Sequence, residues 1–221
     1  MTQVRHSRKA SAFSLIELLT VIAIIAVLAV LTIGAFNQMG QAGNLTKAGS
    51  EIADIFENAR AYAMAHNTYT WVGIRQESDD KILVATVASR DGKAIPVSNA
   101  VSVADSDLLQ IDRMKQFENI RVEDLPASAS HRFSGDGVTS FSGMNPPILS
   151  FEAGAGNNKK LFDSCVVQFN SRGETRILPN EIRKTIEIGL QSSTHGNVHN
   201  PENYVAIHIG GLTGAVSTHR P

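Results

Sequence analysis

Glu17 is the residue whose surroundings most strongly suggest chemistry. It is the only charged residue in the apolar run FSLIELLTVIAIIAVLAVLTIGAF at positions 13–36. A carboxylate inside an apolar membrane helix costs about 3 kcal/mol on insertion scales, so such a group is usually paired or functional. The alternative is that Glu17 lies near the edge of a membrane, where the cost is smaller. Position alone leaves both interpretations open.

Histidines in the C-terminal part of the chain raise the question of a metal site. Their positions are His195, His199, His208 and His219. The first two are four apart, but Gly196 and Pro201 indicate a loop, so the geometry of two ligands on successive helix turns is not available. We expect these histidines to lie on the surface or in turns, and we predict no metal ligands.

Three other patterns do not complete a reactive site. The segment GAGNNKK at 154–160 lacks the strand–loop–helix setting and the terminal Lys-Ser/Thr pair of a phosphate loop. Cys165 is the single cysteine, so it cannot form an internal disulfide, and we expect a small buried residue rather than a nucleophile. The aspartates near 79–80 and 105–112 match no calcium loop, and we expect solvated turn carboxylates. The sequence therefore predicts no catalytic residues and no cofactor, and we expect that the chain is not an enzyme.

The apolar run is long enough to cross a bilayer. At about 1.5 Å per residue, about 20 apolar residues span the hydrocarbon core. Arg5, Arg8 and Lys9 precede the run and no basic residue closely follows it, which predicts a cytoplasmic N-terminus. A secretory signal has a shorter apolar region, of about 7–15 residues, followed by a small-residue cleavage site. No convincing site follows here, so we expect the apolar segment to be retained.

The residues AFSLIELL at 12–19, after a short basic leader, resemble the class III signal of type IV prepilins and type II secretion pseudopilins. The resemblance implies that a prepilin peptidase cuts between Ala12 and Phe13 and that Phe13 is then N-methylated. It also implies that Glu17 pairs, in the membrane, with the free amine of a neighbouring subunit. The family usually has glycine before the cut, whereas this chain has Ala12, which is the next smallest residue.

The residues after the apolar run predict a helix followed by strands. Apolar side chains recur at steps of three and four from Asn44 to Asn67, which predicts an amphipathic helix continuing the first one, loosened at Gly40 and Gly43. The period then changes to two. We predict strands at 68–74, 82–89, 148–151, 165–170, 174–178, 182–191, 204–209 and 215–218. We expect turns at 76–80, 171–174 and 210–214, and a variable loop with one or two edge strands over 91–147.

These patterns predict an α+β fold: a long N-terminal helix, membrane-spanning in its first half, followed by an antiparallel β-sheet head. The expected organisation is a leader at 1–12, a transmembrane and assembly helix at 13–36, its amphipathic continuation at 37–67, and a globular head at 68–221. Within the head, VQFNSRG at 167–173 and a closing hairpin at 204–219 resemble GspH/FimT-type minor pseudopilins. The segment RKTIEIGLQ at 183–191 and the ending THRP resemble the Verru_Chthon cassette protein D family.

The resemblance implies a minor subunit of a type IV pilus-like or type II secretion filament. Its partners would be prepilin peptidase, other pilin subunits and lipid of the bacterial inner membrane, with the head in the periplasm. A second hypothesis is a DNA-binding minor pilin, but the 20 basic and 21 acidic residues nearly cancel, and the tail offers only His219 and Arg220. A third is a membrane-anchored head with an unrelated role.

Overall fold

The computed structural model describes residues 15–94, 107–125, 138–140, 148–178, 181–198 and 200–220, without the side chains of 30–42 and of 157. The chain divides into two compact units, residues 1–40 and residues 41–221. The second unit is called the head below. The described residues form a long helix and mainly antiparallel sheets, so the predicted α+β class is confirmed.

Helix α1 runs from Leu15 to Ala65 and contains Gly40 and Gly43 without interruption. It ends two residues before the predicted Asn67, because Asn67 adopts the left-handed conformation, with φ of 48°. The Thr68 N–H then bonds to the Ala63 carbonyl at 3.0 Å. This pattern is a Schellman cap, in which a left-handed residue satisfies the last carbonyls of a helix.

The first unit contains the beginning of α1. Every described side chain from Leu15 to Ala29 is exposed, and Glu17 is the only charged residue among them. A search confined to the described residues finds no helix that is long and apolar enough to span a membrane.

In the head, six of the described strands form a first sheet in the order β10-β9-β1-β2-β3, with β4 also paired to β2. The strands are β1 (Thr70–Ser78), β2 (Lys81–Ser89), β3 (Leu108–Gln110), β4 (Lys115–Glu118), β9 (Cys165–Phe169) and β10 (Thr175–Arg176). Every pair in this sheet is antiparallel. The β1–β2 turn is tighter than predicted, because β1 extends through Ser78 and leaves only Asp79 and Asp80 between the strands.

A second sheet has the order β12-β11-β13-β14, with β5 and β6 also paired to β11. Its described strands are β5 (Ile120–Glu123), β6 (Val138–Thr139), β11 (Thr185–Thr194), β12 (Asn197–Val198), β13 (Tyr204–Gly210) and β14 (Val216–His219). The β6–β11 pair is parallel, which departs from the purely antiparallel prediction. The described part of 91–147 contributes four strands rather than one or two, and β5 pairs with four residues of β11.

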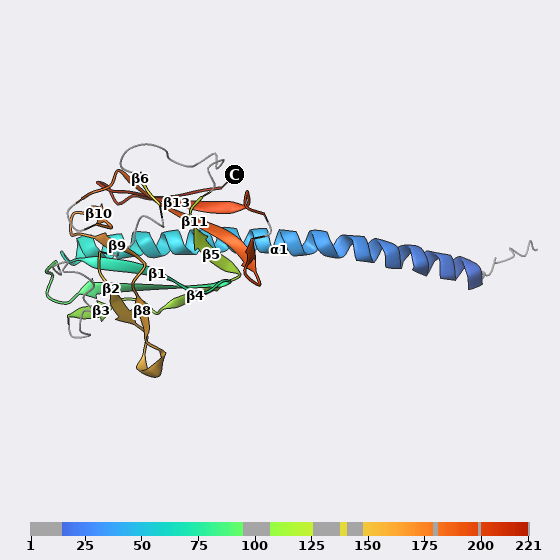
Figure 1. The fold of residues 1–221 in the computed structure, drawn as a ribbon, viewed down its shortest axis with the longest axis horizontal. Coiled ribbons are helices and arrows are strands. Elements are labelled where there is room, and N and C mark those ends of the chain that lie inside the picture. The colour runs from blue at the N-terminus through green and yellow to red at the C-terminus, as the bar shows by residue number, and fades with distance from the viewer. Residues whose placement is uncertain are drawn as a thin grey trace, which may run out of the picture. The chain divides into compact units, whose positions relative to one another are not determined.

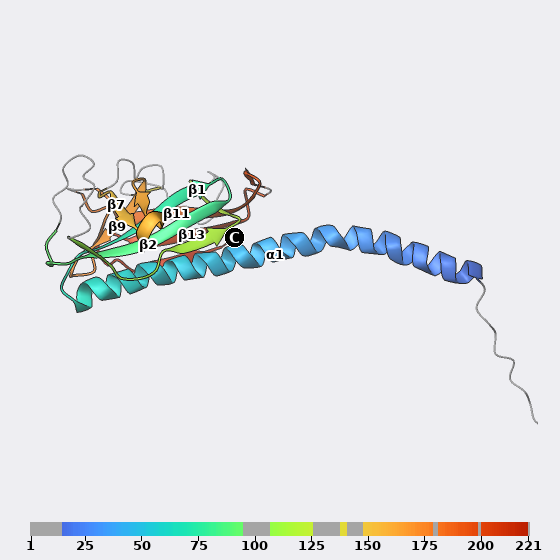
Figure 2. The same ribbon diagram turned by 90° about the horizontal axis from the view of Figure 1, so that it is seen from below.

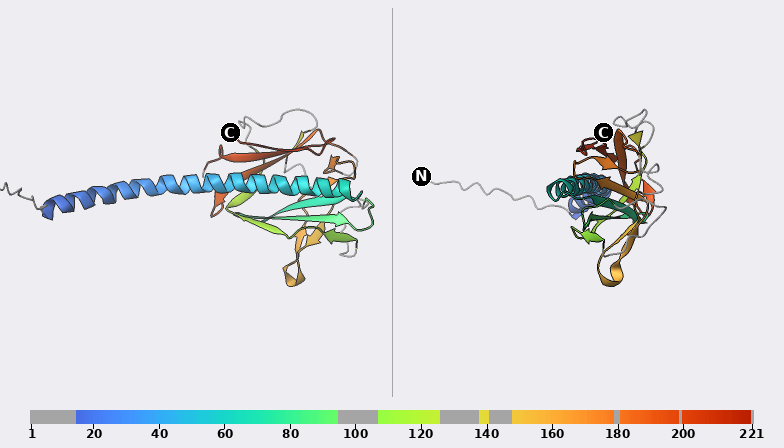
Figure 3. Two further views of the ribbon diagram at one scale, coloured as in Figure 1. Left: turned by 180° about the vertical axis from the view of Figure 1, so that it is seen from behind. Right: turned by 90° about the vertical axis from the view of Figure 1, so that its left-hand side faces the viewer.

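The C-terminal half of α1 forms the core together with both sheets. Figures 1 and 2 show this half of the helix lying alongside strands β1 and β2, in nearly the same direction. Seen from the end in Figure 3, the strands of the two sheets diverge on either side of it. The predicted apolar stripe is buried at Leu45, Ile52, Phe56 and Ala63, in one cluster with side chains from both sheets. The amphipathic spacing therefore reflects packing against two sheets at once.

A second cluster covers the other face of the first sheet. The hairpin of β7 (Phe151–Ala153) and β8 (Lys160–Phe162) packs there, with Trp71 and Val87 beneath it. Phe151 and Phe162 stack with ring centroids 5.2 Å apart. Gly73 of β1 lies against this pair, and the absence of a side chain at this position allows the hairpin to approach the sheet.

Gly73→Ala should destabilise the head. A Cβ at this position would lie 2.8 Å from Phe151 Cζ and 2.9 Å from Phe162 Cβ, so the hairpin must shift. Overpacking of this kind costs about 1–3 kcal/mol. The measurement is denaturant unfolding of the full chain in detergent, followed by the fluorescence of Trp71, which is the only tryptophan and is 1% exposed.

The matched control is Gly43→Ala, because a Cβ built at Gly43 has no atom within 4 Å apart from the neighbouring backbone of its own helix. Alanine raises helix propensity there, so this variant should be neutral or more stable by up to about 1 kcal/mol. Equal stability of the two variants would show that the Phe151–Phe162 hairpin does not pack against Gly73.

Candidate functional site

Glu17 lies in the first turn of α1. Its main-chain carbonyl accepts a hydrogen bond from Thr20 Oγ1 at 2.9 Å. The large apolar neighbours Leu15 and Ile16 are 83% and 65% exposed. The structure therefore places the carboxylate on an apolar helix surface close to the positive end of the helix dipole, where a negative charge is favoured.

The residues of the predicted cleavage and methylation lie outside the part of the chain that the structure describes. Ala12 and Phe13 precede the first described residue, Leu15. The structure therefore leaves the cut between them and the methylation of Phe13 as predictions. Of the three predicted functional residues, only Glu17 has a described position.

Residues 7–33 match the family model described as "Prokaryotic N-terminal methylation motif". The matched segment contains Ala12, Phe13 and Glu17 together with most of the apolar run, so the chain carries a type IV prepilin-like N-terminus. Among curated proteins no relative matches. No solved structure matches either. The resemblance of head segments to particular pseudopilin families therefore stays a prediction.

Two polar contacts attach the head's strands to α1. Thr70 Oγ1, in β1, donates to the Ala59 carbonyl at 3.0 Å, and the threonine is fully buried. On the second sheet, Glu57 Oε1 accepts the Val216 N–H at 2.9 Å. Glu57 Oε2 also pairs with Arg60 at 3.2 Å. Helix α1 is thus hydrogen-bonded to β1 of the first sheet and to β14, which lies at the edge of the second sheet.

His208 corrects the prediction that the histidines lie on the surface or in turns. Its side chain is 4% exposed, and its Nε2 lies 3.3 Å from Oε2 of Glu187, which is 2% exposed. The two residues are direct cross-strand partners on β11 and β13. The His208 ring also lies against that of His219, with centroids 4.7 Å apart. The sequence signal for this pair was a glutamate and a histidine at inward positions of two strand patterns, but register decides whether they meet.

Metal binding gains no support from these side chains. Among the described residues, no group of three or more histidine, cysteine, aspartate or glutamate side chains has a geometry suited to a metal ion. His195, which was one of the candidate ligands, lies in the β11–β12 turn with φ of 52°. His199 lies outside the described residues.

Asp80 joins the two sheets through the β1–β2 turn. Its Oδ1 accepts Ser193 Oγ at 2.7 Å and the Gly196 N–H at 2.8 Å. The Ser193 hydroxyl, followed by the Gly196 amide, lowers the pKa of the Asp80 carboxyl. This carboxylate is therefore used as a structural acceptor in the turn, rather than as the solvated group that we expected.

Two further patterns take structural positions. Cys165 is fully buried, and burial raises the pKa of its thiol to about 12, which makes a reactive thiolate unfavourable at neutral pH. The glycine-rich segment connects β7 and β8 through the short 3₁₀ helix Gly156–Asn158. At the end of this segment, Lys160 pairs with Glu77 of β1, and the hydrogen bond from Lys160 is the largest cause of the lowered pKa of Glu77.

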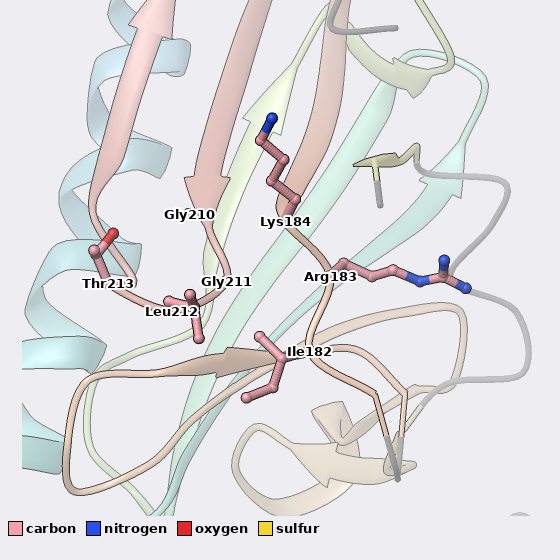
Figure 4. Close-up of a pocket in the computed structure, with 7 residues that line it drawn as sticks. All are labelled: Ile182, Arg183, Lys184, Gly210, Gly211, Leu212 and Thr213. Atoms are coloured by element: carbon pink, nitrogen blue, oxygen red, sulfur yellow. The ribbon is translucent and has the colours of Figure 1, made fainter. Parts of the chain in front are cut away.

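The head carries a groove that the sequence did not reveal. It has a volume of about 490 Å³ and is lined by Ile182, Arg183, Lys184, Gly210, Gly211, Leu212 and Thr213. Figure 4 shows Ile182 and Leu212 directed toward the same space, whereas Arg183 extends away from the others. The groove forms because the β13–β14 turn lies beside the segment that leads into β11. The only local signal in the sequence was a leucine within the glycine-rich turn at 210–214.

The tail residue Arg220 is held within the head. Its Nη2 donates to Asn203 Oδ1 at 2.9 Å. The second tail residue considered for DNA, His219, contacts Ser217 Oγ through its Nε2 at 3.3 Å. Both groups named for the DNA-binding hypothesis therefore make contacts inside the head.

Acid should weaken the joint at Asp80. The pKa of Asp80 in the folded state lies below its value of about 3.9 in the unfolded state. The ionised carboxylate therefore stabilises the folded state fully above about pH 3.9, and this stabilisation is lost as the pH falls through the folded-state pKa. Asp80→Asn should therefore be less stable than the wild type at pH 7, and the difference should shrink below about pH 4. The measurement is urea unfolding between pH 2.5 and 7.

Asp79→Asn is the control, because it removes the adjacent turn carboxylate and leaves the bonds to Ser193 and Gly196 intact. If the free energies of unfolding of Asp80→Asn and the wild type differ by the same amount at every pH, the Asp80 carboxylate is not the stabilising acceptor for Ser193 and Gly196.

Proposed function

We propose that this chain is a minor subunit of a type IV pilus-like or type II secretion filament, with no enzymatic activity of its own. The observation that carries the proposal is the methylation-motif match at residues 7–33, with Glu17 in the first turn of an apolar helix. A motif of this kind implies, in general, processing by a prepilin peptidase and assembly with other pilins.

In this proposal the leader is removed between Ala12 and Phe13, and the new amine of Phe13 is methylated. Residues 13–36 remain in the bacterial inner membrane, with the original N-terminus in the cytoplasm and the head in the periplasm. The arrangement is supported by three basic residues before the apolar run and by the exposed apolar side chains from Leu15 to Leu28. An exposed apolar helix needs lipid or another helix to cover it.

Glu17 supplies the specific contact in this proposal. Its carboxylate pairs with the amine of Phe13 in a neighbouring subunit, because a charge in lipid is tolerated when an opposite charge and hydrogen-bond donors meet it. The pairing sets the axial offset between neighbouring helices. Short segments of the head support the role of a minor subunit, since 167–173 and 204–219 resemble GspH/FimT-type minor pseudopilins, and 183–191 with the THRP ending resembles the Verru_Chthon cassette protein D family.

The first test is the mass of the N-terminal peptide of protein purified from native membranes. We expect a peptide that begins at N-methylated Phe13. A peptide that begins at Met1, or one that begins after the apolar run, would remove the basis of the proposal and would favour an anchored head of unrelated role.

Glu17→Ala should abolish incorporation into filaments while leaving insertion into the membrane intact. Removing one partner of a buried ion pair costs about 3–5 kcal/mol, which corresponds to a loss of incorporation of more than about a hundredfold. The readout is the fraction of the protein in sheared filaments relative to the fraction in membranes.

Thr20→Ala is the matched control, because Thr20 lies one turn away and its hydroxyl bonds to the carbonyl of Glu17 within the same helix. This variant should assemble normally. Normal assembly of Glu17→Ala would refute the pairing mechanism.

A further inference from the structure

A buried carboxylate and a buried imidazole meet on the second sheet. Glu187 of β11 and His208 of β13 are direct cross-strand partners, and their side chains are 2% and 4% exposed. The adjacent residues Ile186, Ile188 and Ile207 pack in the cluster that contains α1. Because successive side chains of a strand point to opposite faces of the sheet, the Glu187–His208 pair lies on the face away from the helix.

The pair is in contact with a third titratable side chain. Glu187 Oε2 lies 3.3 Å from His208 Nε2. The ring of His219, which is partly exposed, lies with its centroid 4.7 Å from that of His208. His219 also contacts Ser217, the residue opposite His208 on β14. The site therefore joins three adjacent strands, β11, β13 and β14, and His219 gives the buried pair a neighbour that reaches solvent.

The other titratable groups on this face contribute little net charge near the pair. Among the described residues, the strand register places Tyr204, Arg121 and Glu123 on the same face of the sheet. Arg121 Nε pairs with Glu123 Oε2 at 3.0 Å, so these two charges compensate each other. Tyr204 is four residues from His208 along β13, a distance of about 13 Å at strand spacing. From β6, the register places the uncharged Val138 on this face.

Burial makes it unfavourable for the pair to lose its proton. Without a proton, Glu187 would be a buried negative charge beside a neutral imidazole, and an uncompensated charge in the interior is costly. With one proton the pair is neutral as a whole, either as carboxylate and imidazolium or as carboxylic acid and imidazole. Both arrangements bind one proton, so the proton count does not depend on which of the two groups carries it.

We propose that the Glu187–His208 pair holds one proton above neutral pH and makes the second sheet of the head sensitive to pH. In the unfolded chain, glutamate and histidine have pKa values of about 4.3 and 6.5, so both groups are almost fully deprotonated at about pH 8. The folded head therefore binds a proton that the unfolded chain releases. The stabilisation is complete below about pH 6.5 and is lost as the pH rises, until the folded pair itself releases the proton.

The pair lies where a change in the sheet reaches the helix. It connects β11 and β13, the two longest described strands of this sheet. Strand β13 continues through a turn into β14, where the Val216 N–H bonds to Glu57 of α1. Loss of the proton therefore weakens the sheet close to its attachment to α1. The pair lies within the head, so this inference goes beyond the proposed function and does not depend on it.

Urea unfolding of the full chain in detergent, followed by Trp71 fluorescence between about pH 5.5 and 9, tests the proposal. The reference is the double variant Glu187→Gln with His208→Gln, which replaces both titrating groups by amides. We divide the unfolding equilibrium constant of the wild type by that of the variant. This ratio should rise by up to about tenfold per pH unit above about pH 7, since one proton is released on unfolding. A ratio that stays constant or falls would overturn the proposal.

Two single variants locate the effect. His66→Gln removes an exposed histidine just after the end of α1 and should keep the pH dependence of the wild type. His219→Gln keeps the pair and removes the ring beside it, so it should keep this dependence as well. If either variant loses the pH dependence, the proton belongs to the histidine that was replaced and the proposal is wrong.

NMR of the wild-type chain counts the proton directly and does not require any variant to fold. At about pH 7.5 we expect either an imidazolium signal from His208 Cε1 or a carboxylic acid signal from Glu187 Cδ, because one of the two groups carries the proton. A neutral imidazole together with an ionised carboxylate at that pH would contradict the proposal. Neither result changes the mass of the N-terminal peptide, so failure of this inference leaves the proposed function standing.

Discussion

The packing of one apolar stripe of α1 against two sheets is the constraint on which the head depends. Leu45, Ile52, Phe56 and Ala63 are buried in a cluster that also contains Val72 and Val167 from one sheet and Ile188 and Ile207 from the other. Neither sheet alone would cover this stripe, and neither sheet could bury its inner face without the helix. The bonds from Thr70 to Ala59 and from Val216 to Glu57 set the position of each sheet along the helix.

The two sheets are also joined away from the helix, at both ends of the head. At one end, Asp80 bonds to Ser193 and Gly196. At the other, Thr175 of β10 donates to the carbonyl of Gly211 in the β13–β14 turn. Both joints also give partners to backbone groups, the Gly196 N–H at one end and the Thr175 N–H and Gly211 carbonyl at the other. They also hold in place the β1–β2 turn and the β13–β14 turn.

Three of the described edge strands, β14, β3 and β4, carry side-chain contacts or charges that protect them. Glu57 bonds to the N–H of Val216 on β14, and Arg90 donates to the Leu108 carbonyl on β3 at 3.2 Å. Strand β4 carries charged residues at both of its ends, Lys115 and Glu118. Protected edges disfavour uncontrolled strand pairing.

The sequence by itself determined the features that arise from local spacing and composition. The apolar run with Glu17, the three-and-four spacing after Asn44 and the glycine turns at 171–174 and 210–214 predicted a long helix, alternating strands and two hairpins, and the structure has them. Tertiary structure alone decided which strands pair, the parallel β6–β11 pair, the burial of His208 beside Glu187 and the groove at Leu212. The physical reason is separation along the chain. Ser193 and Asp80 are 113 positions apart, and no local period carries information about a partner at that distance.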